Sequence, residues 1–569
     1  MHSLLNKIVA RIFAVGLLLI FISFLLPNKI IPWISFWNEM LMALAFVLIA
    51  CVFIGNNWKK QISLNLFIFL IIFIIAIVLQ WIFNIINFTG DAWIGVIYLF
   101  LFFLSIVVGN VLSQREWSNY FLWTLFLSGV ASSAIATIQW LGVGAFGDFI
   151  QILPPGGRPY GNLGQPNHLS TLCFIALCSG FQLYRQDVLN RAILIFSIIL
   201  FSFVMTLTQS RTGVLQSLCL FIFTLWIKKE NKKYEYLFSG GNLLLGLFWW
   251  NILSWLYDVL SIPGGVRDIV VSGSSGRLEI WRTFLSAVLE KPLFGWGWLQ
   301  TAWAQQSVTN CHPISSSYFN YTHFLPLDFI IWFGLPLGLF FCGLIIYWLL
   351  PYLRRDLSSK NDYWLLIVFG FLIHTLLEYP LAYLYFLLPF GVTLGIIERK
   401  QYSHKMLTIP SSALIISWIL LVILLIFSFF DVVRASSAYS EARFSEARIL
   451  SYQKNEEILD LILFNQLESF VHLRSTKAEF IPDEETLELA KKVAQREPQP
   501  WVLMRYAQLL ALAGKQEESR KQQQILCDIN NKSLCSVFSE IWEEWRNNVI
   551  PKDFKISGFE GRVLTPRCQ

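Results

Sequence analysis

A polar segment, "GRPYGNLGQPNH" (157–168), lies between two long apolar runs of the chain. Its candidate binding residues are Arg158, Asn162, Gln165, Asn167 and His168. Pro166 or Asn167 is expected to open the helix that follows, and the free N–H groups and dipole of a helix start attract anions. The segment therefore predicts a site for an anion and a polar substrate. The alternative is a re-entrant loop whose side chains satisfy only its own backbone.

Three further arginines fall between apolar runs. Arg211 stands in the short turn "TLTQSRTGVLQ" (206–216), and Arg277 and Arg282 stand in "SSGRLEIWR" (274–282). A guanidinium fork suits phosphate, so these arginines and Arg158 are candidate ligands of a pyrophosphate group. Two alternatives remain open. Arg211 is also explained as an interfacial snorkelling residue, and the other two as surface partners of Asp258, Asp268 or Glu279.

A candidate base stands where a later apolar run begins. His323 lies in "YFNYTHFLPLDFIIWFGLPLG" (318–338), and neutral imidazole is the side chain best suited to accept a proton near neutral pH. Glu378 and Tyr379 occupy a Pro-broken hairpin in "HTLLEYPLAYLYFLLPFG" (374–391). A structural role for the histidine and a structural ion pair for the glutamate are the alternatives.

These residue types suit an anionic, lipid-linked substrate. Arginines would hold a pyrophosphate and stabilise it as the leaving group, while His323 would deprotonate an incoming hydroxyl. No Cys/His or Asp/Glu grouping has metal-ligand spacing, so neither a metal nor a cofactor is expected.

Composition indicates a polytopic membrane protein. The 569 residues are 56% hydrophobic and only 14% charged, whereas soluble domains carry about 25% charged residues. Apolar runs long enough to cross a bilayer predict about thirteen helices. They cover approximately residues 8–26, 36–54, 62–87, 93–112, 118–141, 168–185, 192–208, 213–228, 236–256, 324–352, 363–378, 381–397 and 411–431.

Basic residues predict the orientation of these helices. Lys and Arg gather in alternate loops, at positions 59–60, 115, 185–191, 228–233, 354–360 and 398–405. The positive-inside rule then places the N-terminus in the cytoplasm and the candidate site on the opposite, outer face of the membrane. The long connection 257–323 and everything after residue 431 are expected on that same outer face. The net charge of +6 is accounted for by topology and does not indicate nucleic acid.

The chain is expected to divide into a transmembrane catalytic domain (1–431) and a helical domain outside the cytoplasm (432–569). Residues 483–526 resemble one tetratricopeptide unit, in which Pro498 and Pro500 separate two helices and Gly514 ends the second. A helical domain without repeats is the alternative. Cys527 and Cys535 are close enough in sequence to form a disulfide, which the sequence alone leaves open.

The motifs above resemble those of the O-antigen ligase and polymerase superfamily, and within it the bacterial pilin-type protein O-oligosaccharyltransferases (PglL type). Three features carry the resemblance: the segment 157–168, the spacing of His323 to Gly334, and the Glu-Tyr/Pro hairpin at 374–391. Phe324 and Leu337 depart from the usual pattern, in which an amide or hydroxyl side chain follows the histidine and a small or hydroxyl residue follows the glycine three positions on.

The resemblance implies en bloc transfer of an oligosaccharide from undecaprenyl pyrophosphate to a Ser or Thr of a periplasmic protein such as pilin. It implies metal-independent, inverting chemistry in the inner membrane, with His323 as the catalytic base. By the same resemblance, Arg277 and Arg211 bind pyrophosphate, Tyr379 lies beside the site, and the donor or acceptor site is lined by Arg158, Asn162, Gln165, Asn167 and His168. By residue type and position, Arg158 and Arg282 are further candidates for binding pyrophosphate, and Glu378 is one for the donor or acceptor site.

Two alternatives remain. An O-antigen ligase or a polysaccharide polymerase would use the same lipid-linked donor and a similar pocket. A polyprenyl-lipid or polysaccharide transporter would place charges near the bilayer midplane and commonly show internal repeats. The clustering of polar residues at one predicted face favours a transferase over a transporter.

Overall fold

The computed structural model describes residues 2–27, 29–54, 58–114, 117–144, 147, 149–154, 156–226, 233–266, 276–354, 363–401, 405–447, 459–548, 556–559 and 561. Several residues used in the sequence predictions lie outside this set. They are Arg115, Asp268 and the basic loops at 228–232, 355–360 and 402–404.

Every predicted apolar run coincides with a helix. These helices are α1 (His2–Leu25), α2 (Phe36–Ile54), α3 (Leu64–Ile82), α4 (Thr89–Leu112), α5 (Trp117–Trp140), α6 (Pro166–Arg185), α7 (Arg191–Leu207), α8 (Arg211–Trp226), α9 (Lys233–Val259), α12 (Leu325–Arg354), α13 (Tyr363–Thr375), α14 (Leu384–Gln401) and α15 (Ser411–Glu446). By length and composition, seven described helices can cross a membrane: α1 to α5, α12 and α15. Three more apolar helices, α7, α8 and α13, are shorter, so the count of thirteen spans stays a prediction.

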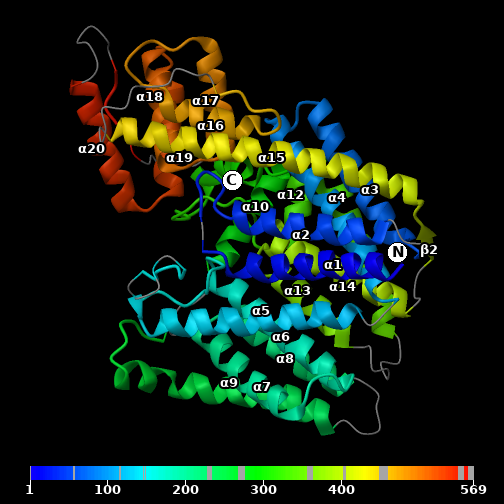
Figure 1. Ribbon diagram of the computed structural model, residues 1–569. Coiled ribbons are helices and arrows are strands. Elements are labelled where there is room, and N and C mark those ends of the chain that lie inside the picture. The colour runs from blue at the N-terminus through cyan, green and yellow to red at the C-terminus, as the bar shows by residue number, and fades with distance from the viewer. Residues whose placement is uncertain are drawn as a thin grey trace.

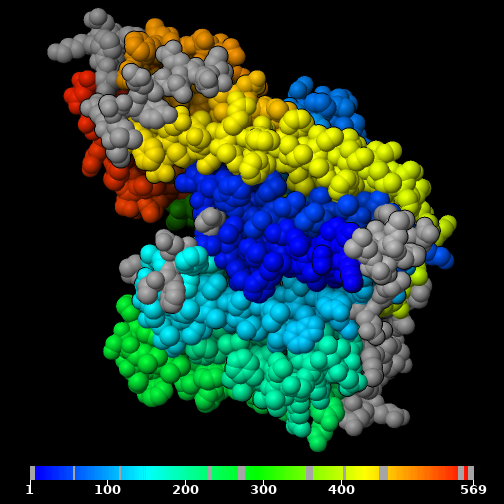
Figure 2. All heavy atoms as spheres, viewed as in Figure 1, coloured from blue at the N-terminus to red at the C-terminus, as the bar shows by residue number. Residues whose placement is uncertain are grey.

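The helices form layers (Figure 1). Helices α1 and α2 pack on each other, and α5 joins α1 to the group formed by α6, α7, α8 and α9. The C-terminal helices lie beside the polar end of α15, and a hollow separates them from the α5–α9 layer on the left of the view in Figure 2.

Helices α4 and α14 pack unusually closely because small residues face one another. A Cβ added to Gly395 would lie 2.0 Å from the Ile106 carbonyl oxygen, and one added to Gly109 would lie 2.1 Å from that of Val392. Gly391 meets Ser105 in the same way. Spacings of four residues between small side chains let helix backbones approach in this manner. This contact fixes α14 and the hairpin that precedes it.

Helix α12 is broken at Gly334, which has φ 79° and ψ 172°. The connection after α10 (Arg277–Glu290) repairs the break. The Trp296 and Gly297 amides donate to the Ile331 and Trp332 carbonyls, and the Leu335 amide donates to the Pro292 carbonyl. Backbone groups at membrane depth need such partners. The connection 257–323, which was predicted as a long loop, contains two helices, α10 and α11 (Thr301–Val308).

The C-terminal part is helical: α16 (Asn465–Ser475), α17 (Glu484–Arg496), α18 (Pro500–Leu512), α19 (Gln516–Ile529) and α20 (Lys532–Asn548). Helix α17 ends before Pro498, and α18 ends before Gly514, where the sequence predicted the two breaks. A disulfide joins Cys527 to Cys535. Helix α15 continues to Glu446, past the predicted domain boundary at 431, since helix formation does not stop where hydrophobicity does.

Two short strands were not predicted. β1 (Gln61–Ser63) pairs antiparallel with β2 (Met406–Thr408), next to the starts of α3 and α15. A strand of three residues is too short to show the alternating pattern by which strands are recognised in a sequence. This strand pair joins the start of α3 to the start of α15 in an otherwise helical fold.

Candidate active site

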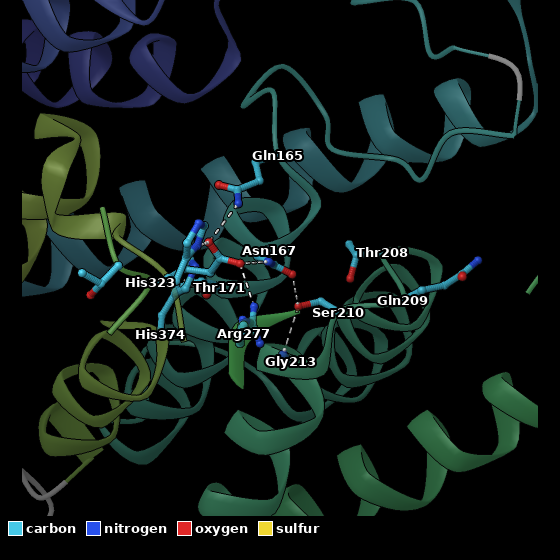
Figure 3. A network of polar contacts seen from close by, with 12 residues as sticks. Gln165, Asn167, Thr171, Thr208, Gln209, Ser210, Gly213, Arg277, His323 and His374 are labelled. Atoms are coloured by element: carbon cyan, nitrogen blue, oxygen red, sulfur yellow. Dashed lines mark hydrogen bonds and ion pairs between the residues drawn. The ribbon is translucent and has the colours of Figure 1, made fainter. Parts of the chain in front are cut away.

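Glu378 is the centre of the candidate site. Its Oε2 accepts a hydrogen bond from His323 Nδ1 at 2.5 Å, and its Oε1 accepts one from Arg277 Nη2 at 2.7 Å. Asn167 Nδ2 donates to Oε1 at 3.0 Å, and Gln165 Nε2 donates to Oε2 at 3.5 Å. Four predicted site residues from three separate segments thus converge on a fifth, as Figure 3 shows for the four donors.

The carboxyl group of Glu378 is kept ionised by these partners. Burial alone would raise its pKa, but the hydrogen bond and charge of His323 and the charge of Arg277 outweigh burial and lower the pKa to about 2. A carboxylate so stabilised is a poor proton acceptor at neutral pH. It is well suited to orient a neighbouring base.

His323 is held in a fixed backbone conformation. Its φ of 60° lies in the left-handed region, which is unusual for a residue other than glycine and is often found at functional sites. The preceding residue is anchored twice, because Trp281 Nε1 donates to the Thr322 carbonyl and the Thr322 amide donates to Asp328 Oδ1. Helices α10 and α12 together therefore position the imidazole.

The start of α6 is tied to the start of α8. Ser210 Oγ donates to Asn167 Oδ1 at 2.7 Å and accepts from the Gly213 amide at 3.3 Å (Figure 3). Asn167 thus links α8 to Glu378. Ser210 was not among the predicted residues, although its place directly before Arg211 in a short turn was a signal that could have found it.

Tyr379 forms one wall of the site. Its ring lies edge-on to His323, with centroids 5.0 Å apart, and stacks on Tyr321 at 4.5 Å. Both tyrosines and Glu378 line a cavity of about 690 Å³. The cavity continues between apolar side chains of α3, α4, α12 and α14, among them Phe69, Leu344 and Leu394. Sequence reasoning missed Tyr321.

Other predicted residues lie outside this hydrogen-bonded cluster. Asn162 is buried, and its side-chain amide bonds to backbone groups. It donates to the Leu25 and Phe149 carbonyls and accepts from the Gln151 amide. His168 is buried against Tyr385, with Nδ1 3.2 Å from the tyrosine hydroxyl. Both support the start of α6 and its approach loop.

The remaining arginines occupy different surroundings. Arg158 donates to the carbonyls of Thr208 and Gln209, next to the start of α8, whose first residue is Arg211. Arg282 is exposed and pairs with Glu279 one turn earlier on α10. Of the four predicted arginines, Arg277 contacts the Glu378 cluster directly. Among the described residues, no group of three or more His, Cys, Asp or Glu side chains could hold a metal ion.

The chain is thus a helical membrane protein in which a histidine and an arginine share one buried carboxylate. Residues 196–342 match the family described as O-antigen ligase, and residues 363–526 match the family described as virulence factor membrane-bound polymerase, C-terminal.

Two curated proteins of Acinetobacter baylyi are similar to the chain. A general O-oligosaccharyltransferase is 30% identical over 527 residues, covering 89% of this chain and 90% of its own length. A ComP-specific O-oligosaccharyltransferase is 30% identical over 428 residues, covering 71% and 74%. No solved structure matches. The chain belongs to the PglL-type O-oligosaccharyltransferases, and it is a membrane enzyme of the glycosyltransferase type.

Proposed function

We propose that the chain transfers an oligosaccharide en bloc from undecaprenyl pyrophosphate to a Ser or Thr hydroxyl of a periplasmic protein such as pilin, with His323 as the general base. The observation that carries this proposal is the Glu378 cluster. It joins a potential base, a guanidinium and the amides at the start of α6 at one point beside a large cavity.

The tautomer of His323 follows from its partner. An ionised carboxylate only accepts hydrogen bonds, so Nδ1 must carry the proton that Glu378 receives. In the neutral imidazole, Nε2 then holds the free lone pair. The positioned carboxylate also stabilises the imidazolium that forms when Nε2 takes a proton, as in hydrolase triads.

Arg277 is placed to receive the leaving group. One arm of its guanidinium, Nη2, bonds to Glu378, and among the described residues its other nitrogens make no hydrogen bond. Those nitrogens can bind the pyrophosphate, assisted by the positive end of the α6 dipole. The acceptor oxygen then attacks the anomeric carbon, the bond from that carbon to the phosphate oxygen breaks, and the hydroxyl proton passes to His323 Nε2. Direct displacement inverts the anomeric centre.

The apolar extension of the cavity favours a polyprenyl carrier. Its lining between α3, α4, α12 and α14 is rich in Phe, Leu and Ile side chains and suits a long hydrocarbon chain. The Cys527–Cys535 disulfide fits an oxidising compartment such as the periplasm. The disulfide accords with the outer-face position predicted for the C-terminal region.

The test is co-expression of the chain with a lipid-linked glycan pathway and a candidate pilin, followed by intact-mass measurement of the pilin. The pilin should gain the glycan mass with the wild-type chain and not with His323→Ala. His312→Ala is a matched control, since His312 bonds to Ser286 and not to Glu378. Unmodified pilin together with glycosylated lipid A core would contradict the proposal and indicate an O-antigen ligase.

A further inference from the structure

The C-terminal helices contribute to the wall of the catalytic cavity. Arg496, the last residue of α17, and the adjoining Glu497 and Gln499 line the same cavity as Glu378 and Tyr379. The proposed reaction requires none of these three residues. Their place in the wall therefore calls for a separate explanation.

Arg496 is fixed to the membrane domain by a buried ion pair. Its Nε donates to both carboxylate oxygens of Asp91 on α4, at 3.1 and 2.9 Å. The side chains are 14% and 0% exposed. Nη1 donates to Glu497 Oε1, which leaves Nη2 without a hydrogen-bond partner among the described residues. A rigidly held guanidinium thus retains donor capacity at the cavity wall.

The wall between Arg496 and the reaction centre is aromatic. Tyr321 stacks on Tyr379 with an interplanar angle of 17°, and Tyr379 contacts His323. Tyr318 also lines the cavity, and its hydroxyl donates to Glu497 Oε2 at 3.3 Å. The cavity wall therefore runs from Tyr379, which contacts His323, along the ring of Tyr321 to the Arg496–Glu497 pair.

This combination suits sugars better than a protein surface. The C–H faces of sugar rings pack on aromatic rings, and their hydroxyls bond well to charged donors and acceptors. A folded acceptor protein cannot enter a cavity of about 690 Å³, whereas a narrow glycan can. The polyprenyl chain, in turn, needs the apolar branch and not this charged one.

We propose that the segment from the end of α17 to the start of α18, through Arg496, Glu497 and Gln499, binds the distal sugars of the donor glycan, so that the C-terminal domain selects the glycan. This inference rests on the proposed function. It assigns Arg496 a role in donor specificity, with no part in proton transfer.

The experiment compares two synthetic donors with one acceptor. Both are undecaprenyl pyrophosphates: one carries a single N-acetylhexosamine, and the other carries a linear pentasaccharide that begins with that sugar. The variant Arg496→Lys, in purified and reconstituted protein, keeps a positive charge beside Asp91 but loses the planar guanidinium and its additional N–H donors. It should lower the ratio of kcat/KM for the pentasaccharide to kcat/KM for the single sugar about 10- to 100-fold, as expected for a lost charged hydrogen bond.

Gln499→Ala provides a second test, because Gln499 makes no contact with Asp91, and it should lower the same ratio in the same direction. Arg505→Gln is the matched control, since Arg505 pairs with Glu446 away from the cavity, and its ratio should equal that of the wild type. An equal loss for both donors, or no loss, in Arg496→Lys and Gln499→Ala would overturn the inference. If the wild-type chain transferred neither glycan, the proposed function itself would fail.

Discussion

At the residue scale, the proposed chemistry depends on one carboxylate that joins three segments. Glu378 lies 55 residues from His323, 101 from Arg277 and 211 from Asn167 in the chain. It is in direct contact with no reacting atom in the proposed mechanism. Its proposed role is to orient His323, the proposed base, and one arm of Arg277, the proposed phosphate ligand, which would make it a positioning residue.

Glu378→Gln should lower kcat about 10²- to 10⁴-fold, while KM for the donor changes far less. A neutral amide can donate to Nδ1 and so stabilise the wrong imidazole tautomer. Transfer assays with purified protein at several pH values check this expectation. Glu279→Gln serves as control, because that carboxylate is exposed and pairs with Arg282. Wild-type kcat in Glu378→Gln would contradict the orienting role.

The same group predicts a pH dependence of stability. Its pKa falls from the ordinary 4.5 to about 2 in the folded protein, so its contribution is fully present above about pH 4.5 and is lost as the pH falls through 2. The shift corresponds to about 3 kcal/mol. Thermal unfolding in detergent between pH 5.5 and 2.5 should therefore show a steeper loss for the wild type than for Glu378→Gln. Parallel curves would argue against the ion-paired cluster.

The members of this cluster were largely predictable from the sequence, but their arrangement was not. Polar side chains close to the bilayer are costly and are usually kept for a function. On that ground the sequence identified five candidate site residues: Gln165, Asn167, Arg277, His323 and Glu378. Nothing in the chain specified that Glu378 would be the shared acceptor, because contacts between distant segments leave no periodic signal. Because such contacts cannot be seen in the sequence, Asn162 was predicted as a site residue, although its amide donates to backbone carbonyls.

At the scale of the elements, apolar run length was enough to predict a helix at each of thirteen places. It did not reveal that α12 breaks at Gly334 or that residues 292–297 complete the broken helix. The sequence marked Gly334 only by its spacing from His323. The structure gives a physical reason for glycine there, since positive φ and contact with the Leu293 carbonyl both exclude a side chain.

Gly334→Ala should destabilise the protein by about 1–3 kcal/mol and reduce transfer. The added Cβ would lie 2.3 Å from the Leu293 carbonyl oxygen, which displaces the connection between α10 and α11. Melting temperature and transfer rate report the two effects. Gly343→Ala is the matched control on the same helix, because a Cβ there meets no atom within 4 Å. Equal behaviour of the two variants would show that the break does not support the site.

At the scale of the whole molecule, the C-terminal domain is docked on the membrane helices by polar contacts. Asp431 near the middle of α15 accepts from the Ile462, Leu463 and Phe464 amides, and the Gly90 amide donates to Asn465 Oδ1. With the Asp91–Arg496 pair, these contacts make the domain part of the cavity. Composition separated the two regions at residue 431 but carried no information about this interface.

Asp91→Asn should loosen the docked domain and reduce transfer of every donor glycan. The substitution removes the fully buried one of the two carboxylates that pair with Arg496 and leaves Glu497 in place. The loss of a charged hydrogen bond of this kind typically costs about 1.5–3 kcal/mol. Limited proteolysis in detergent should then separate the C-terminal domain faster than in the wild type. Glu484→Gln is the control, because it removes a far more exposed ion pair with Lys515 within the same domain. If Asp91→Asn resisted protease as well as the wild type and kept its transfer rate, the ion pair would not be what holds the cavity wall together.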